Sequence, residues 1–547
     1  MRSTPIPDST SEKEPARKPA TSGFADDKLP EGSVVDGATL VADRSEAFDY
    51  VVVGSGASGA VAAHVLAKAG FSVAIVEEGP WVKTRDFGDR AFETFQRMAR
   101  DAGTQMIEGR SYIPLLQGRC VGGSTVMNSA IAHRTPEDVL DDWARRFGLG
   151  DAIGSRILEP HFDALETELS AKLVSENAVG ANNRLFLDGA KAAGLQASRT
   201  HRYERGCKGS GQCVTGCPHA AKQSMNVSYV PWALALGARL FTSCRVDRVF
   251  FRDDGRAAGV IAQSNDDQRP TRPRFRVTLH GRRGVIVAAS TIQTPNLLRR
   301  SGLRGRTIGR HFQCHPGFAL AGVFDHPVAP SLGATQGAES LHFLSTDRFK
   351  LETLGVPPEL AVMRFPGIGR ELMQQLGDFA NLAIWAVVVR AEAEGTVRAG
   401  WGGRDKATLT LTRNDMERMR KGTAVLARTM FQGGAREVWP GIFGIPGVLR
   451  SIDEVRLIEE VPADPRLFSM ITTHLFGAAR MGKDPATSVV APNFETHEAS
   501  GLYVVDSSVF PTNLGVNPQH SIMAMSRLAA TRIAADSGAG KTHGVAA

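Results

Sequence analysis

The chain has 547 residues, enough for several average domains or for one large α/β enzyme with insertions. Its net charge of +7 comes from Arg and Lys residues scattered along the chain, so a nucleic-acid-binding surface is not indicated. The same positive charge is compatible with peripheral contact with an anionic membrane. No apolar run is long enough for a transmembrane segment. The longest, Phe379 to Val389, predicts a buried strand instead.

The N-terminal part of the chain is polar and rich in Pro, Ser and Thr, and it lacks the apolar segment of an export signal. We expect residues 1–45 to form a largely disordered tail that leads into the first strand. Six cysteines are too few for a disulfide-based scaffold, which favours a reducing compartment. The sequence therefore predicts a cytoplasmic protein.

The stretch FDYVVVGSGASGAVAAHVLAKAGFSVAIVEEG, from Phe48, has the order of a dinucleotide-binding unit. A strand at 50–53 precedes a G-x-G-x-x-G turn, a helix at 57–69 and a second strand at 71–76 that ends at Glu77. The glycines allow the backbone to approach a pyrophosphate, and an acid after the second strand can accept from a ribose hydroxyl. The alternative is that Glu77 or Glu78 is a solvated loop acid. Glu77 is favoured because it directly follows the strand. The residues expected at the cofactor here are Gly54, Gly56, Ser58, Gly59 and Glu77.

NAD and FAD both use such a unit, and further segments favour FAD. The stretch GRCVGGSTVMNSAI, from Gly118, resembles the second fingerprint of the glucose–methanol–choline (GMC) flavoprotein oxidoreductases. Four more segments resemble this family in the same order: VIVAASTIQTPNLLRRSG from Val285, IGRHFQCHPG from Ile308, THLFGAARMG from Thr473, and GLYVVDSSVFPTNLGVNPQHSIMAMSRLAA from Gly501. The motifs are most similar to those of long-chain alcohol oxidases and dehydrogenases. The resemblance implies an FAD enzyme.

The resemblance also implies the architecture. It predicts an α/β fold in which a Rossmann-like FAD-binding domain is interleaved with an α+β substrate-binding domain built on an antiparallel sheet. The FAD-binding domain would comprise residues 46–135, 240–330 and 485–537. The substrate-binding domain and its lid would comprise 136–239 and 331–484, and residues 538–547 would be a flexible C-terminus.

The cofactor residues implied by the resemblance follow from the matched motifs. Along the pyrophosphate and the isoalloxazine edge it places Gly122, Gly123, Ser124 and Asn128. It also implies that Val246 pairs with adenine through its main chain and that Asp506 lies near the ribityl and phosphate groups. The alternative for Asp506 is helix capping. Some relatives tether the flavin through a histidine near this loop, but the residue before Asn128 is Met127, so we expect non-covalent FAD.

The resemblance implies a catalytic pair. His474 matches the family histidine that faces the flavin, and a neutral imidazole can accept the hydroxyl proton of an alcohol while hydride leaves for flavin N5. The second position falls on Asn517, which we favour over His520, a polar residue of the first helical turn. Asn517 and Pro518 also form a typical N-cap and N1 pair for a helix at 518–534, whose N-terminus would stabilise the reduced flavin.

A cysteine cluster, CKGSGQCVTGCP, contains Cys207, Cys213 and Cys217. Thiolates suit iron–sulfur sites, and dehydrogenases of this family with three such cysteines carry a cluster. The first spacing departs from the one expected in those relatives, which favours a glycine-rich turn with free thiols and no metal. Both alternatives stay open.

The predicted function is oxidation of an apolar alcohol, long-chain or otherwise bulky, to the aldehyde or ketone. Oxidation or dehydrogenation of a sterol is the second hypothesis, and an FAD-containing hydroxynitrile-type lyase or a non-catalytic flavoprotein are hypotheses of other classes. The expected electron acceptor is oxygen, a quinone or a protein carrier, and the sequence does not distinguish among the three.

Overall fold

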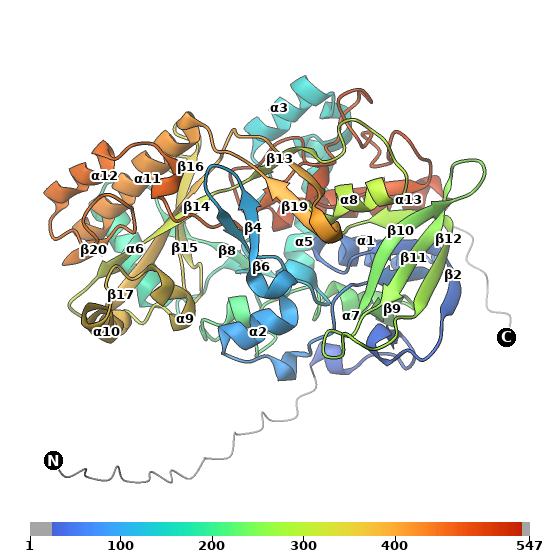
Figure 1. Cartoon of the computed structure of the whole chain (residues 1–547), viewed down its shortest axis with the longest axis horizontal. Coiled ribbons are helices and arrows are strands. Elements are labelled where there is room, and N and C mark those ends of the chain that lie inside the picture. Colours follow the sequence, from blue (N-terminus) through green and yellow to red (C-terminus); the bar gives the residue numbers. More distant parts are fainter. Residues whose placement is uncertain (1–23, 539–547) are drawn as a thin grey trace, which may run out of the picture.

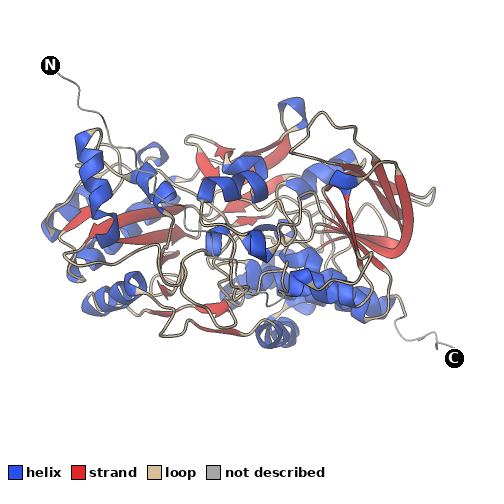
Figure 2. Cartoon of the chain, turned by 90° about the horizontal axis from the view of Figure 1, so that it is seen from below, coloured by secondary structure: helices blue, strands red, loops and turns tan. Residues whose placement is uncertain are grey.

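The computed structural model describes residues 24–538 (Figure 1). Its strands form one eight-stranded sheet, two six-stranded sheets and one two-stranded sheet. Viewed after a 90° turn, strands lie at both ends of the molecule and also between them, with helices packed around them (Figure 2). Among residues 24–538, no helix combines the length and apolar character needed to cross a membrane.

The eight-stranded sheet carries the expected dinucleotide-binding unit. Its order is β1(Val34–Asp36)-β9(Arg239–Thr242)-β3(Val73–Val76)-β2(Arg44–Val53)-β12(Arg276–Val287)-β11(Ala257–Ser264)-β10(Cys244–Phe251), and β22(Leu502–Val504) also pairs with β12. Along the order β1-β9-β3-β2-β12 neighbouring strands pair in parallel, and β22 also pairs in parallel with β12. The pairs β12–β11 and β11–β10 are antiparallel. All four residues of β3 are buried, as expected for a parallel strand covered on both faces.

Helices from distant parts of the sequence cover this sheet. α1(Ala57–Lys68) contacts α7(Tyr229–Ala235) and α13(Gln519–Asp536), and α13 in turn contacts α5(Ser155–Glu168). α1 is almost entirely apolar and buried, and the chain leaves it through Gly70 in the left-handed region with φ +88. One continuous hydrophobic core therefore joins the first and last segments of the chain.

A second sheet lies between the two ends, in the order β21(Leu475–Phe476)-β13(Arg310–Cys314)-β18(Gly395–Ala399)-β19(Asp405–Thr408)-β4(Gln105–Glu108)-β5(Ile113–Leu115). β21 follows directly after His474, so this sheet carries the segment expected to hold the catalytic histidine. The two-stranded sheet is formed by β6(Ala171–Leu173) and β8(His201–Tyr203).

The third sheet is antiparallel, in the order β20(Glu437–Trp439)-β14(Gly317–Val323)-β17(Leu382–Val389)-β16(Phe349–Thr353)-β15(Ala338–Ser340)-β7(Ser198–Arg199). α11(Arg413–Gln432) and α6(Ala181–Ala192) cover one face, and their side chains share a core with β16 and β17. β17 confirms the buried strand predicted from its apolar run. The remaining helices are α2(Ala91–Met98), α3(Glu137–Phe147), α4(Gly150–Ile153), α8(Gln293–Arg300), α9(Pro358–Ala361), α10(Arg370–Gly377) and α12(Arg456–Glu460).

The expected α/β class, with a parallel sheet and a separate antiparallel sheet, is confirmed. The disordered tail over 1–45 is wrong for its last part, because the apolar pair Val34 and Val35 adds β1 to the main sheet beside β9. Residues 1–23 and 539–547 lie outside the described residues. The boundary at 330 also differs from the strand pairing: residues 310–323 form β13 and β14, which belong to the other two sheets. The other domain boundaries stay predictions.

Candidate active site

The first glycine turn is built for close backbone approach. Gly54 has φ +100, and a Cβ there would lie 2.4 Å from the Ala288 carbonyl oxygen. A Cβ on Gly59 would lie 2.0 Å from the Gly54 oxygen, so the helix can pack on the turn only without side chains. α1 starts after Gly56 with no side-chain cap, which leaves backbone N–H groups of its first turn available to an anion.

The second glycine loop meets the first. Gly122 and Gly123 both have positive φ, +93 and +54, and a Cβ on Gly123 would lie 3.0 Å from the Gly56 Cα. The Gly118 N–H donates to Ser124 Oγ at 3.0 Å, which closes the loop on itself. Two side-chain-free segments and an uncapped helix N-terminus thus face each other, and this arrangement fits the pyrophosphate of FAD.

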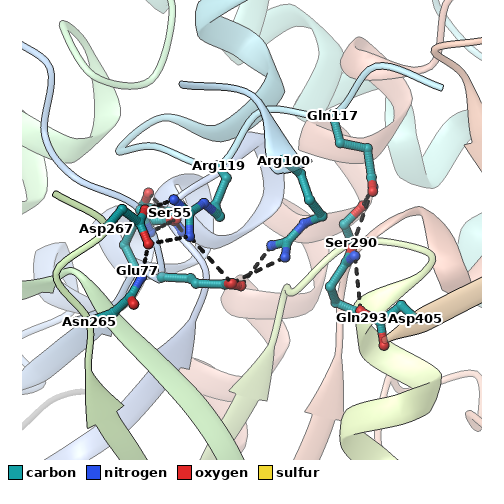
Figure 3. A network of polar contacts seen from close by, with 12 residues as sticks. Ser55, Glu77, Arg100, Gln117, Arg119, Asn265, Asp267, Ser290, Gln293 and Asp405 are labelled. Carbon is teal, nitrogen blue, oxygen red and sulfur yellow. Dashed lines mark hydrogen bonds and ion pairs between the residues drawn. The ribbon is translucent and has the colours of Figure 1, made fainter. Parts of the chain in front are cut away.

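Glu77 joins the two loops. Its carboxylate accepts from the Ser55 N–H at 3.0 Å and from Ser55 Oγ at 2.7 Å; Figure 3 labels both residues. It also accepts from the Gly79 N–H at 2.9 Å, and Ser55 Oγ accepts from the Gly122 N–H at 3.0 Å. Burial raises the pKa of Glu77. Glu78 points elsewhere and pairs with Arg100 at 2.7 Å. The ribose contact expected of Glu77 stays a prediction; its carboxylate supports the first loop directly and the second loop through Ser55 Oγ.

Asp506 ties three segments of the expected cofactor domain together. Its carboxylate accepts from the Ser508 N–H at 2.9 Å, from the Ser290 N–H at 3.0 Å and from Thr294 Oγ1 at 2.6 Å. Ser290 Oγ in turn accepts from Gln117 Nε2 at 2.9 Å, next to the second glycine loop (Figure 3). The capping alternative for Asp506 is therefore present, and it is compatible with a place beside the cofactor.

The other expected cofactor residues lie in ordered contacts around these loops. Asn128 Nδ2 donates to Gln519 Oε1 at the start of α13, and Ser58 accepts through its main chain from Ser526 Oγ at 2.7 Å in the same helix. Val246 lies in β10 and pairs with Ala262. Their contacts with FAD stay predictions. Met127 is buried in an apolar cluster beside this loop.

His474 and Asn517 are brought together from segments 43 residues apart, with Nε2 of the imidazole 3.3 Å from Nδ2 of the amide. Burial, followed by the charges of Lys350 and His133, lowers the pKa of His474 to about 3. The imidazole is therefore neutral at physiological pH. His520 lies apart from this pair, where it contacts Glu166 at 3.1 Å and the Tyr203 hydroxyl.

Asn517 does not cap the helix as expected. The N-cap position is occupied by Pro518, with φ −87 and ψ −11, and α13 begins at Gln519. The Asn517 side chain is instead held by the ammonium of Lys350, which donates to Oδ1 at 2.5 Å. The prediction of the cap is wrong by one residue, because a buried cation competes successfully for the amide oxygen.

His315 orients the ring of His474, with 3.2 Å between the two Nδ1 atoms. The Gly515 N–H donates to Nε2 of His315 at 2.9 Å, which favours a neutral His315 with its proton on Nδ1, where it can donate to His474. That donation would leave the His474 proton on Nε2, whereas Nδ2 of Asn517 is a donor and needs an unprotonated Nε2 as its acceptor, so the two contacts favour opposite tautomers of His474. Asn513 allows a second hydrogen-bond arrangement of His315. Its Oδ1 is buried without a hydrogen-bond partner, and an interaction with its side chain opposes the lowering of the His315 pKa by burial.

Sequence reasoning missed His315 and Lys350. His315 lies within the segment IGRHFQCHPG, which carries part of the family resemblance. That resemblance gives the position of His315 in the chain but does not predict its contact with His474. Lys350 lies in β16, outside every recognised motif, and only the register of the antiparallel sheet places it at the site.

The three cysteines of the cluster line one small cavity together with Arg202 and Lys222, and all three are free thiols. Arg202 Nη2 lies 3.0 Å from Cys213 Sγ. Although burial alone would raise the pKa of Cys213, the charges of Arg202 and Lys222 outweigh it and lower the pKa. Among residues 24–538, no group of three or more His, Cys, Asp or Glu side chains is arranged to hold a metal ion. The iron–sulfur alternative stays untested.

The glycine loops, the His474–Asn517 pair and the two kinds of sheet fit a flavin-dependent oxidoreductase, and comparison with known proteins gives the family. The GMC oxidoreductase family matches through its N-terminal part at residues 48–317 and through its C-terminal part at 403–526. The chain belongs to this family, whose typical cofactor is FAD.

Several relatives share most of the chain. A GMC-type oxidoreductase of Mycobacterium tuberculosis, described as uncharacterized, is 35% identical over 483 residues, covering 87% of this chain and 74% of the relative. Another of Sinorhizobium fredii, described in the same way, is 32% identical over 486 residues, covering 87% and 92%. A long-chain-alcohol oxidase of Arabidopsis thaliana is 27% identical over 522 residues, covering 89% and 66%.

Solved structures share the fold. The pyridoxine 4-oxidase of Mesorbium loti superposes with a TM-score of 0.68 at 18% identity, covering 88% of this chain and 98% of that chain. A formate oxidase of Aspergillus oryzae gives 0.67 at 17% identity, covering 91% and 99%. At these identities the likeness supports the architecture alone.

Proposed function

We propose that this GMC oxidoreductase oxidises an apolar alcohol, long-chain or otherwise bulky, to the aldehyde or ketone. The observation that carries the proposal is the pairing of a neutral His474 with Asn517 at 3.3 Å, in a chain whose glycine loops fit FAD. The relationship to a long-chain-alcohol oxidase supports the substrate class. Bound FAD would supply the hydride acceptor, and the chain's own residues would handle the proton and the oxygen.

The substrate oxygen would lie between His474 and Asn517. Nδ2 of Asn517 can only donate, so it would stabilise the negative charge that grows on the oxygen as the hydroxyl proton leaves. The N-terminus of α13 has no side-chain cap and begins two residues after Asn517, so it would add positive potential near the Asn517 amide. These groups favour the alkoxide-like state over the neutral alcohol.

His474 would receive the hydroxyl proton at Nε2, and this step requires its own proton on Nδ1. The Gly515–His315 contact favours the opposite tautomer, whereas the Asn517 amide, which donates from Nδ2, favours this one. The reverse tautomer becomes available when His315 donates from Nε2 to the free Oδ1 of Asn513 and accepts at Nδ1 from His474. Substrate binding would thus select the base-competent form of a pair of neutral imidazoles.

We also propose that FAD is bound without a covalent link, since Met127 offers no tethering nucleophile, and that the protein is cytoplasmic. The six cysteines, all free, support a reducing compartment. Oxygen, a quinone or a protein carrier would accept the electrons.

The test is anaerobic reduction of the bound flavin by a series of primary alcohols of increasing chain length. Bleaching of the visible absorption that strengthens with chain length would support the proposal. Bleaching by a sterol and by no linear alcohol would favour the sterol hypothesis. Cleavage of a hydroxynitrile without bleaching would favour the lyase, and no bleaching with any alcohol would refute oxidation of an alcohol.

A further inference from the structure

Lys350 is a buried cation that no recognised motif contains. It lies in β16, where Phe349, Leu351 and Thr353 alternate with Lys350 and Glu352, so the two charged side chains share one face of the strand. Phe349 and Leu351 point into the core under α11, and the charged face points away from it. The Lys350 side chain is 0% exposed.

Two buried carboxylates surround this ammonium. Glu339 and Glu352 are direct partners across β15 and β16, and each is 4% exposed. Like charges opposite each other on neighbouring strands repel, and Lys350 offsets the repulsion by pairing with Glu339 at 3.2 Å and Glu352 at 2.8 Å. His133 contacts Glu339 at 2.8 Å, and Gln336 donates to Glu352 at 2.7 Å.

The third contact of the ammonium is the oxygen of Asn517, at 2.5 Å. A carboxamide has nearly the same shape in its two orientations, so packing alone does not choose between them. The Lys350 ammonium can only donate hydrogen bonds, so a hydrogen bond with Asn517 forms only when Oδ1 of the amide faces Lys350. Nδ2 is then the atom that faces His474.

We propose that Lys350 is a positioning residue that holds the Asn517 amide with its NH₂ group toward the substrate oxygen. This inference rests on the proposed function for its catalytic meaning, and on the contacts of Lys350 for its geometry. Glu339 and Glu352 form the support that keeps the ammonium in place. The chain of contacts runs from two carboxylates through Lys350 and Asn517 to His474.

Loss of Lys350 has a defined consequence. The freed amide can turn, and its Oδ1 would then face Nε2 of His474, where it would stabilise the tautomer with the proton on Nε2 by accepting from it. That internal bond removes the donor for the substrate oxygen and occupies the nitrogen that should face the hydroxyl. Binding and the chemical step would both suffer, while the glycine loops would not be touched.

The test uses a charge-neutral change, because Lys350→Met alone leaves two buried carboxylates facing each other and can prevent folding. The variant Lys350→Met/Glu352→Gln removes one positive and one negative charge, and Glu352→Gln alone is its reference. Both are also made in an Asn517→Ala background. Arg418→Met, which removes ion pairs to Asp415 and Glu392 elsewhere in the same domain, is the matched control.

Two quantities are measured: the rate of flavin reduction by alcohol under argon, and the Tm of the holoprotein. We expect the Lys350 change to lower the reduction rate by about 10- to 100-fold, the order of one lost oxyanion donor or less. In the Asn517→Ala background the same change should have little effect on the rate. FAD content should stay near that of the wild type, and Arg418→Met should keep the rate within about twofold.

Equal losses of rate in both Asn517 backgrounds would overturn the proposal, since Lys350 would then act independently of the amide. The Tm cycle gives a second readout that needs no substrate: the drop in Tm caused by the Lys350 change should be smaller when Asn517 is Ala. If the wild type is bleached by no alcohol, the proposed function fails, while a Tm cycle without coupling refutes the Lys350–Asn517 contact itself.

Discussion

The role of His474 is tested by comparing His474→Ala with His474→Gln. Alanine removes both the proton acceptor and the hydrogen-bond donor, whereas glutamine keeps an N–H donor of similar reach and cannot act as a base at neutral pH. If His474 takes the hydroxyl proton, both variants should lose about 10²- to 10⁴-fold in the rate of flavin reduction. If it serves only as a donor, alanine should lose about 10²- to 10³-fold and glutamine far less.

The structure gives the expected pH dependence. Burial first, and then the charges of Lys350 and His133, lowers the pKa of His474 to about 3, and the side chains that it contacts are the neutral His315 and the uncharged amide of Asn517. The imidazole is uncharged above that pKa, so the fraction able to accept a proton is already complete well below neutrality. We expect the wild-type rate of flavin reduction to be independent of His474 ionisation from about pH 5 upward.

The assay is stopped-flow reduction under argon, with FAD content measured in parallel. Flavin content should survive both substitutions, because the side chain of His474 contacts His315 and Asn517 and not the glycine loops. His520→Gln is the control, since this histidine faces Glu166 and Tyr203. Near-wild-type reduction by His474→Gln would refute the base assignment, and a loss in the control as large as in His474→Ala would refute the choice of residue.

Three further outcomes are expected. Acid precipitation should release the yellow colour into the supernatant, because Met127 replaces a tethering histidine, and colour that stays with the pellet would contradict non-covalent FAD. Gly123→Ala should lower FAD content, since Gly123 has φ +54 and the new Cβ would lie 3.0 Å from the Cα of Gly56 in the first glycine turn. Gly194→Ala is the control: it also has a positive φ, +70, but its Cβ would have no neighbour within 4 Å, so FAD content should be kept. Protein purified without air should contain little iron or acid-labile sulfide, and near-stoichiometric iron per FAD that is lost in Cys213→Ser would establish the cluster instead.

The dinucleotide unit was predictable from sequence because its signals are local. The apolar strand before Gly54, the glycine spacing and the acid after the second strand depend on neighbours within about one supersecondary unit. The structure places the helix as α1 and the second strand as β3 within two residues of the expected ranges, whereas the first strand, β2, ends as expected at Val53 but begins six residues earlier, at Arg44. What the local pattern did not contain is the support that Glu77 gives to a loop more than 40 residues away.

The helix cap at Asn517 shows where local rules fail. Asn before Pro is a strong helix-start signal in isolation. Here the amide oxygen is bound by Lys350, a residue 167 positions earlier in the chain, and the helix begins two residues after Asn517. A charge-assisted hydrogen bond to a buried ammonium is stronger than a capping bond between neutral groups, and α13 begins at Gln519 without a side-chain cap.

Lys350 itself illustrates the harder problem. The stretch FKLET alternates apolar and polar side chains, a pattern typical of a strand with one face in solvent. In the structure all five residues of β16 are buried, because the polar face lies against the segments that carry His133 and Asn517. A charged face can be covered only where its charges are compensated, and two glutamates and one lysine come close to that condition by themselves. The Asn517 amide oxygen is an additional acceptor for the Lys350 ammonium. Through this contact the ionic cluster would orient the amide so that its NH₂ group faces His474.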